Sequence, residues 1–299
     1  TSTDSSCNNP IVLGSGESAA IDIANTASGS PAASYGDITT AVAGTTIGLC
    51  GTTCSGSYGF SLNSPGFSKI TAGSLIVGDS NNGDITVEGV TTTIDNVTLN
   101  ATNSTGRSIT FNTGSSSFKG LTANASNGIV LSSGVTTQGT TSFDSDTDAE
   151  TNIGGDFSLA AGQTLNTSNN PLSITANDIA LGSRGSINSG TAGTTFLAAK
   201  SARTIGLGSG TGDFSLSDTE LGLISGSSLT IGNSSNGTLT VAGVTSASTP
   251  LTLNATSSGS AVNFTTIASS GLGSLTINAG NGGVDLGVAV SYTHLRAHE

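Results

Sequence analysis

Ser74–Thr91 reads SLIVGDSNNGDITVEGVT and Ser228–Thr245 reads SLTIGNSSNGTLTVAGVT, so the chain contains this stretch twice, 154 residues apart (228 − 74). The match continues at the same offset, where VTLNATNS from Val97 recurs as LTLNATSS from Leu251. Self-similarity at a fixed offset is typical of solenoids, propellers and arrays. The repeat therefore favours a fold that is built from stacked or arrayed units.

Inside each copy, short segments of alternating polarity recur every eight to twelve residues. In DITVEGV, Ile85, Val87 and Gly89 fall on one face, and Thr86 and Glu88 fall on the other. This period of two predicts a strand that is buried on one side. Clusters of Gly, Asn and Ser separate the strands and supply the backbone angles that tight turns need.

The side chains available for a core are small, because Ile, Val, Leu and Ala dominate, Phe is scarce and Trp is absent. A narrow coil stacks such residues in columns, whereas a sandwich of this size normally buries larger aromatic rings. Asn100 and Asn254 are expected at turns, where like residues one coil apart form hydrogen-bonded ladders. The sequence thus predicts an all-β fold, a parallel β-helix (β-solenoid) with coils of roughly 20–24 residues.

The predicted solenoid covers residues 1–289 and divides into copy 1, about 47–200, and copy 2, about 205–289, which is truncated. We expect on the order of thirteen coils, and a rod of roughly 60 Å at ~4.8 Å per coil. The chain has the character of an open fragment of a longer gene.

The composition argues against several classes of binding partner. Charged residues make up 9% of the chain, far below the roughly 25% of ordinary globular proteins. The formal net charge is −12, and the seven Lys and Arg residues are scattered along the sequence. Clustered cations are needed to follow phosphates, so we expect no nucleic-acid partner and no anionic membrane surface. No run of eighteen apolar residues exists, so no membrane insertion of a helix is expected.

The stretch Val290–Glu299 reads VSYTHLRAHE and resembles the translation of a transposase adapter used in short-read sequencing libraries. It contains both histidines of the chain, His294 and His298. We therefore treat residues 290–299 as a non-native tail. Ser291–Glu299 are expected to make no packed contacts with the coils.

Three segments carry a likeness to a known family: PLSITANDIALGSRGSI from Pro171, SGSSLTIGNSSNGTLTVAGV from Ser225 and LGSLTINAGNGGVDLG from Leu272. They resemble the coils of filamentous haemagglutinin-type exoproteins, which include two-partner secretion adhesins and large autotransporter adhesins of Gram-negative bacteria. The resemblance covers most of residues 45–289. It implies a right-handed β-helix that is exported by an outer-membrane transporter and displayed extracellularly, at the cell surface.

The same resemblance implies a non-catalytic stalk or passenger segment that mediates attachment. Its partner would be a receptor or glycan on a host or environmental surface, and no cofactor is expected. Two alternatives stay open, a β-helical carbohydrate-active enzyme and a segment of a phage tail-spike. An ice-binding solenoid is disfavoured, because the threonines form no regular columns in the sequence.

Catalysis finds little support, since residues 1–289 contain no histidine that could activate a nucleophile. Carbohydrate enzymes on this fold use grouped carboxylates with a cationic base. Asp213, Asp218 and Glu220 lie some way from Arg203 in the sequence and fall where turns are expected. We predict that the chain is not an enzyme.

Two acidic segments are weak candidates for calcium. The first offers oxygen ligands at alternate positions, but copy 2 keeps its turn and loses its carboxylates, so a plain turn is favoured. The second is the densest acidic run, and an exposed loop in water is favoured there. The candidate residues are Asp79, Asn81 and Asp84 in the first segment and Asp144, Asp146 and Asp148 in the second. No metal site is predicted.

Cys50 and Cys54 bracket three residues, and a small disulfide-closed loop between them is plausible in an oxidising compartment. Alignment on TIGL places Gly208 and Gly212 at these two positions in copy 2, so both cysteines are absent there together. A zinc site is disfavoured, since no histidine or second cysteine pair accompanies them.

Overall fold

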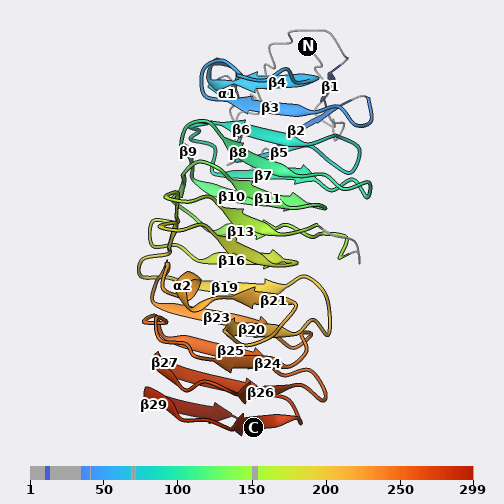
Figure 1. Cartoon of the computed structure of the whole chain (residues 1–299). Coiled ribbons are helices and arrows are strands. Elements are labelled where there is room, and N and C mark those ends of the chain that lie inside the picture. Colours follow the sequence, from blue (N-terminus) through green and yellow to red (C-terminus); the bar gives the residue numbers. More distant parts are fainter. Residues whose placement is uncertain are drawn as a thin grey trace, which may run out of the picture.

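The computed structural model describes residues 11–13, 35–40, 42–68, 70, 72–149 and 154–298. Nearly all regular structure is β, and the strands stack in parallel along one axis from β1 at one end to β29 at the other (Figure 1). Successive strands of a face come from successive coils of the chain. The molecule is therefore a parallel β-helix, which confirms the predicted fold class.

The first face is one sheet of twelve parallel strands that runs the length of the rod. In stacking order they are β1 (Ile11–Leu13), β2 (Tyr35–Thr40), β5 (Ser74–Val77), β7 (Asn96–Ala101), β10 (Gly120–Ala125), β13 (Thr141–Asp144), β16 (Leu172–Ala176), β19 (Gly193–Ala198), β23 (Ser228–Asn233), β25 (Leu251–Ala255), β27 (Ser269–Ala279) and β29 (Val290–His298).

The second face is divided into two sheets, of seven and five strands. The first contains β4 (Phe60–Asn63), β3 (Ile47–Cys50), β6 (Ile85–Glu88), β8 (Ile109–Asn112), β11 (Ile129–Leu131), β14 (Phe157–Leu159) and β17 (Ile179–Leu181). The second contains β21 (Phe214–Leu216), β20 (Ile205–Gly208), β24 (Leu239–Ala242), β26 (Ala261–Phe264) and β28 (Gly283–Leu286). At the division, Asp178 accepts hydrogen bonds from Ser215 through its side chain, 2.7 Å from the backbone nitrogen.

A third face of five short strands closes the coil over the middle of the rod. It contains β9 (Ser116–Phe118), β12 (Val135–Thr137), β15 (Thr164–Asn166), β18 (Ser186–Asn188) and β22 (Ile224–Ser225). Two four-residue helices complete the described elements, α1 (Ser64–Phe67) and α2 (Asp218–Leu221).

The coil length varies more than predicted. The register of the first face gives 22 residues from Ser74 to Asn96 (96 − 74) and 24 from Asn96 to Gly120 (120 − 96). However, 39 residues separate Tyr35 from its partner Ser74 (74 − 35). The coils between β13 and β16 and between β19 and β23 are also long, at 31 (172 − 141) and 35 residues (229 − 194). The range of 20–24 is thus right for the plain coils and wrong where the chain carries insertions.

Two of these insertions build the same element. In copy 1, β3 is followed by β4 and α1, and in copy 2, β20 is followed by β21 and α2. The strands β4 and β21 begin with the same Phe-Ser-Leu, at Phe60 and Phe214, which lie 154 residues apart (214 − 60). The helices that follow read SPGF and DTEL and share no residue, so sequence comparison missed the equivalence.

The core is a column of inward side chains in which alternate strand residues are fully buried, Val87 among them. It is not purely aliphatic, because seven phenylalanines are fully buried, in contrast to the expected column of small residues: Phe111, Phe118, Phe143, Phe157, Phe196, Phe214 and Phe264. Phe111 meets Phe118 and Phe143 edge to face, with ring centroids 6.3 and 6.4 Å apart. Such pairs add about 0.5–1.5 kcal/mol beyond area burial.

On the outer surface, like residues stack from coil to coil. Asn124 Nδ2 donates to Asn100 Oδ1 at 2.8 Å, and Asn278 Nδ2 donates to Asn254 Oδ1 at 2.6 Å. The predicted ladders are therefore present, although the asparagines lie within strands rather than in turns.

A column of hydroxyl side chains runs beside these ladders on the same face, contrary to the expectation that the threonines form no columns. Its members are Thr98, Thr122, Ser142, Ser173, Thr195, Thr230, Thr252 and Thr276. The irregular coil length hides this column in the sequence.

The tail also differs from expectation. Val290–His298 form β29, whose backbone pairs with β27, with Leu275 opposite Leu295 and Ile277 opposite Ala297. The expectation of no packed contact is thus wrong for the backbone. The physical reason is that a terminal strand presents unpaired N–H and C=O groups, which pair with any extended segment within reach.

Candidate functional site

The equivalent insertions place a loop over the outer side of the second face in each copy. In copy 1 this loop covers residues 51–59, between β3 and β4, and in copy 2 it covers residues 209–213, between β20 and β21. Both loops are fixed by the same bond, because Gly59 N donates to Thr46 Oγ1 at 3.2 Å and Asp213 N donates to Thr204 Oγ1 at 3.0 Å.

This bond sets the correspondence between the copies. Gly59 lies 13 residues after its threonine and Asp213 lies 9 residues after its own, so the copy 1 loop is four residues longer (13 − 9). Gly212 therefore corresponds to Tyr58. The alignment on TIGL, which set Gly212 against Cys54, is wrong because it ignores this insertion.

The copy 1 loop is closed by the predicted bridge, since Cys50 and Cys54 are disulfide-bonded with their Cα atoms 5.1 Å apart. Cys50 ends β3 and is fully buried. The loop then folds back so that the ring of Tyr58 lies on Gly48, where an added β-carbon would be 2.1 Å from Cδ2 of the ring. A glycine at position 48 is thus required by the close approach of the ring.

The loop is held to the next coil by Glu88 of β6. Glu88 accepts hydrogen bonds from Ser55 N at 2.6 Å, from Ser55 Oγ at 2.8 Å and from the Tyr58 hydroxyl at 2.5 Å. Although its alternation predicted a solvent-facing residue, Glu88 is only 6% exposed, because the loop covers the outer side of the strand. Ala242 stands at the corresponding position in copy 2 (242 − 154 = 88).

The three hydrogen bonds also set the charge of Glu88. Burial by itself would raise the pKa of Glu88, but the donors from Ser55 and Tyr58 outweigh it and the pKa is lowered from its ordinary 4.5. Burial raises the pKa of Tyr58, and its bond to Glu88 raises it further. The carboxylate is therefore ionised and the phenol protonated at neutral pH, so the loop is fastened by a charge-assisted hydrogen bond.

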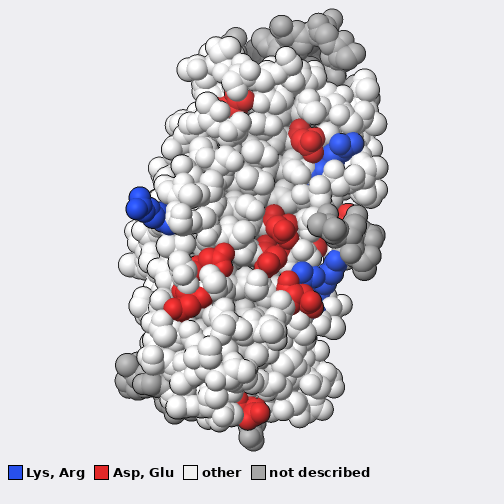
Figure 2. All heavy atoms as spheres, in the orientation of Figure 1, with Lys and Arg blue, Asp and Glu red and all other residues white. Residues whose placement is uncertain are grey.

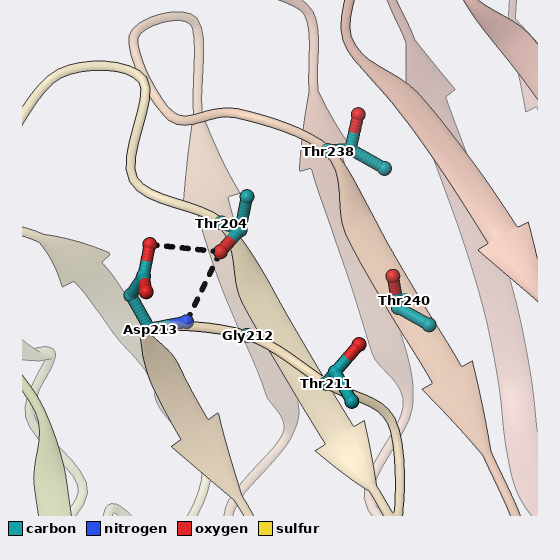
Figure 3. A pocket seen from close by; sticks show the side chains of 6 residues that line it. All are labelled: Thr204, Thr211, Gly212, Asp213, Thr238 and Thr240. Carbon is teal, nitrogen blue, oxygen red and sulfur yellow. Dashed lines mark hydrogen bonds between the residues drawn. The ribbon is translucent and has the colours of Figure 1, made fainter.

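The copy 2 loop has no ring beneath it. A β-carbon on Gly206 would lie 2.2 Å from the Gly210 carbonyl oxygen, so the loop backbone rests directly on β20. Beside the loop, over β24, the surface has a hollow of about 370 Å³. It is lined by Thr204, Thr211, Gly212, Asp213, Thr238 and Thr240 (Figure 3).

The hollow is polar. The Asp213 carboxylate accepts a hydrogen bond from Thr204 Oγ1 at 3.0 Å, while Thr211, Thr238 and Thr240 each bring a hydroxyl and a methyl group (Figure 3). Arg203 donates from Nη2 to the Asp213 carbonyl oxygen at 2.8 Å. The arrangement offers hydrogen-bond donors and acceptors to a small ligand, and its lining contains no histidine.

The other carboxylates of the enzyme alternative hold the backbone of neighbouring coils. Asp218 Oδ1 accepts from the backbone nitrogens of Thr245 and Ser246 at 2.6 and 2.8 Å. Burial by itself would raise the pKa of Asp218, but these bonds outweigh it and lower the pKa. Glu220 caps α2 and accepts from Leu181 N at 2.8 Å. These acids lie in α2 rather than in a turn, and the structure brings them into no catalytic group.

The first calcium candidate is occupied by its own turn. Asp79 Oδ1 accepts from the backbone of Asn81 at 2.7 Å and of Asn82 at 3.2 Å. Asp84 Oδ1 accepts from Ser108 N, in the next coil, at 2.9 Å. In copy 2, Asn233 Oδ1 takes the place of Asp79 with the same pair of backbone bonds, so the turn does not depend on the carboxylate charge.

The acidic run is less exposed than expected. Asp146 is only 5% exposed, and its Oδ2 has no hydrogen-bond partner in the described structure; the same holds for Oδ1 of Asp148. Burial raises the pKa of Asp146 to about 6, with further contributions from Asp148 and Asp144 that Lys200 partly offsets. Burial likewise raises the pKa of Asp144. The run therefore contains a buried acid, which a solvated loop would lack.

Among the described residues, no three His, Cys, Asp or Glu side chains lie close enough together to hold a metal ion. No helix in the described part of the chain is long and apolar enough to cross a membrane. Comparison with protein-family models, with curated proteins and with solved structures finds no match to this chain.

Proposed function

We propose that the chain is a stiff, non-catalytic stalk or passenger segment of a secreted bacterial surface exoprotein, of the filamentous haemagglutinin type, which mediates attachment. In this role the solenoid carries binding surfaces away from the cell. The segment would reach the cell surface through an outer-membrane transporter and would meet a receptor or glycan there.

One observation carries the proposal: the first face is a single ladder of twelve parallel strands. Each coil contributes one strand to this ladder and packs its core residues on those of its neighbours. Stability in such a solenoid is roughly the sum of coil and interface contributions. Bending the rod would break several backbone hydrogen bonds at once, so the architecture resists bending without large side chains.

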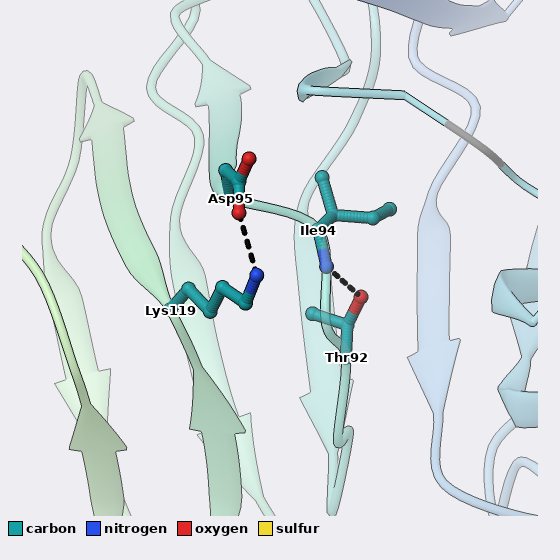
Figure 4. A network of polar contacts seen from close by, with 4 residues as sticks. All are labelled: Thr92, Ile94, Asp95 and Lys119. Carbon is teal, nitrogen blue, oxygen red and sulfur yellow. Dashed lines mark hydrogen bonds and ion pairs between the residues drawn. The ribbon is translucent and has the colours of Figure 1, made fainter.

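The surface agrees with a solvated spacer. In Figure 2 the acidic side chains lie in separate spots, and few Lys or Arg side chains accompany them. Among the described residues one ion pair forms, between Lys119 Nζ and Asp95 Oδ1 at 2.6 Å (Figure 4). Its side chains are 47% and 70% exposed, and exposed pairs contribute about 0–1 kcal/mol. The rod therefore relies on its ladders and core.

Rigidity can be measured with spin labels on Thr98 of β7 and Thr252 of β25, which lie in the same outward column. A background in which the native cysteines are replaced by serine leaves only the labelled positions. Six steps of ~4.8 Å place the labels roughly 29 Å apart. We expect a narrow distance distribution that is unchanged between low salt and 1 M salt. A broad or salt-dependent distribution would contradict the stiff rod.

Attachment can be measured with beads coated with the chain. Beads that carry the folded chain should stay on mucin or polysaccharide surfaces several times better than beads that carry the urea-unfolded chain. Equal retention would count against an adhesive role. Release of reducing ends from those polysaccharides would instead favour the carbohydrate enzyme, and a trimer in sedimentation would favour the tail-spike.

A further inference from the structure

We propose that the hollow over β24 is a binding site for a pyranose ring of a neutral glycan. The inference comes from a comparison of the two copies and does not depend on the rod being stiff. A flexible chain could still bind a sugar here, and a stiff rod could lack the site, so the two proposals fail separately.

In copy 1 the loop carries a ring of its own onto the second face. Tyr58 lies on Gly48 of β3, and its hydroxyl crosses to Glu88 of β6. On that strand Thr86, which corresponds to Thr240 (240 − 154), pairs with Gly48. The ring thus lies over Gly48 of β3, and its hydroxyl reaches the outer side of β6.

In copy 2 the ring is absent, and the shorter loop itself covers Gly206, the counterpart of Gly48. Gly212 stands where copy 1 has Tyr58, and the loop descends onto Gly206. The space over Thr240 of β24 becomes part of the hollow. Its volume of about 370 Å³ falls within the ~300–1,000 Å³ of small-molecule sites.

The chemistry of the lining also bears on the ligand. Glu88, the acceptor of the phenol, is replaced by Ala242 in copy 2, so the hollow is not suited to a tyrosine from another chain. Asp213 and four threonines line it instead. Several hydroxyl partners beside methyl groups match a ring that carries several hydroxyls and C–H faces. The carboxylate of Asp213 opposes anionic sugars, so among common glycans the hollow fits a neutral one.

The test is saturation-transfer NMR of the full chain with four probes at millimolar concentration, the methyl glycosides of glucose, galactose, mannose and N-acetylglucosamine. We expect transfer to at least one of them. In the variants Thr240→Val and Thr211→Val, which keep the side-chain shape and remove a hydroxyl, the transfer should fall at least fivefold. Thr86→Val, the matched change in copy 1, should leave it unchanged.

Three results would overturn the site: transfer to none of the four probes, transfer that survives both copy 2 variants, or transfer that falls equally in Thr86→Val. Because Thr240 and Thr86 both point outward from strands, the variants keep the core intact. A melting curve for each variant verifies this before binding is compared.

Discussion

The hydroxyl of Tyr58 and Oε1 of Glu88 lie 2.5 Å apart and join a disulfide-closed loop to the next coil of the solenoid. Tyr58 and its acceptor Glu88 occur together in copy 1 and are both missing in copy 2, where Gly212 and Ala242 stand at the corresponding positions. The pair thus behaves as one structural unit added to a plain coil.

Tyr58→Phe should destabilise the chain by about 1–2 kcal/mol, because it leaves a buried carboxylate with one donor fewer. The effect should depend on pH. The pKa of Glu88 is lowered in the folded state, so its contribution is present above the unfolded pKa of about 4.5 and is lost as the pH falls through the folded value. Urea unfolding from pH 2 to pH 7 measures this. A double-mutant cycle with Glu88→Gln isolates the pair, and a coupling of zero would contradict it.

Reduction of the Cys50–Cys54 bridge should lower stability by about 2 kcal/mol, the value that chain entropy gives for a closed loop of five residues. The loop should also release Tyr58, so that its phenol titrates closer to the ordinary pKa of 10. Thermal unfolding and ultraviolet titration with and without reductant report both changes. A bridge that is reduced without moving either quantity would show that Glu88 alone holds the loop.

Val87→Asp should lower the free energy of unfolding by about 3–5 kcal/mol. Val87 is fully buried, and the apolar core offers no hydrogen-bond or ionic partner to a carboxylate. The matched control is Thr110→Asp, on the outward side of β8, which should change stability by less than about 1 kcal/mol. The denaturant midpoints of the two variants test whether Val87 points into the core and Thr110 points outward. Similar costs for both would contradict the inward column.

Asp146→Asn should stabilise the chain at neutral pH by about 1 kcal/mol, after a discount for the solvent near the acid. Its pKa is raised from 3.8 to about 6 in the folded state. Asp146 therefore contributes favourably to the free energy of unfolding below pH 3.8, and this contribution is lost as the pH rises through 6. The benefit of the variant should thus vanish below pH 4. The opposite trend, a benefit only in acid, would contradict the burial of Asp146.

Deletion of residues 290–299 should remove one terminal strand and leave the remaining coils folded, since each coil depends mainly on its neighbours. Hydrogen exchange tests the pairing of β29 directly. Amides from Thr293 to His298 should be protected in the full chain if the ladder extends to them. Exchange at the rate of a free peptide would show that the tail stays unpaired.

The sequence predicted the fold because strand alternation and turn residues are local signals. The inward Val87 and the turn at Asp79 followed from them, and the 154-residue offset identified the solenoid. Because the coil lengths are irregular, the sequence alone does not show which residues of neighbouring coils lie opposite one another. The hydroxyl column and the partner of Tyr58 exist only once coils of different length are stacked. Glu88 shows the limit most clearly, because its alternation was right and only the distant loop, 30 residues earlier, decides that it is buried.

The two loops stand on the same side of the rod, since β4 and β21 both belong to the second face. About seven rungs separate them, which corresponds to roughly 34 Å at ~4.8 Å per rung. A partner that contacts both loops would therefore meet them at a fixed spacing. A sequence change in one loop would alter which ligand it binds and leave the distance between the loops unchanged. Binding specificity can therefore vary while the solenoid keeps the loops at a constant separation.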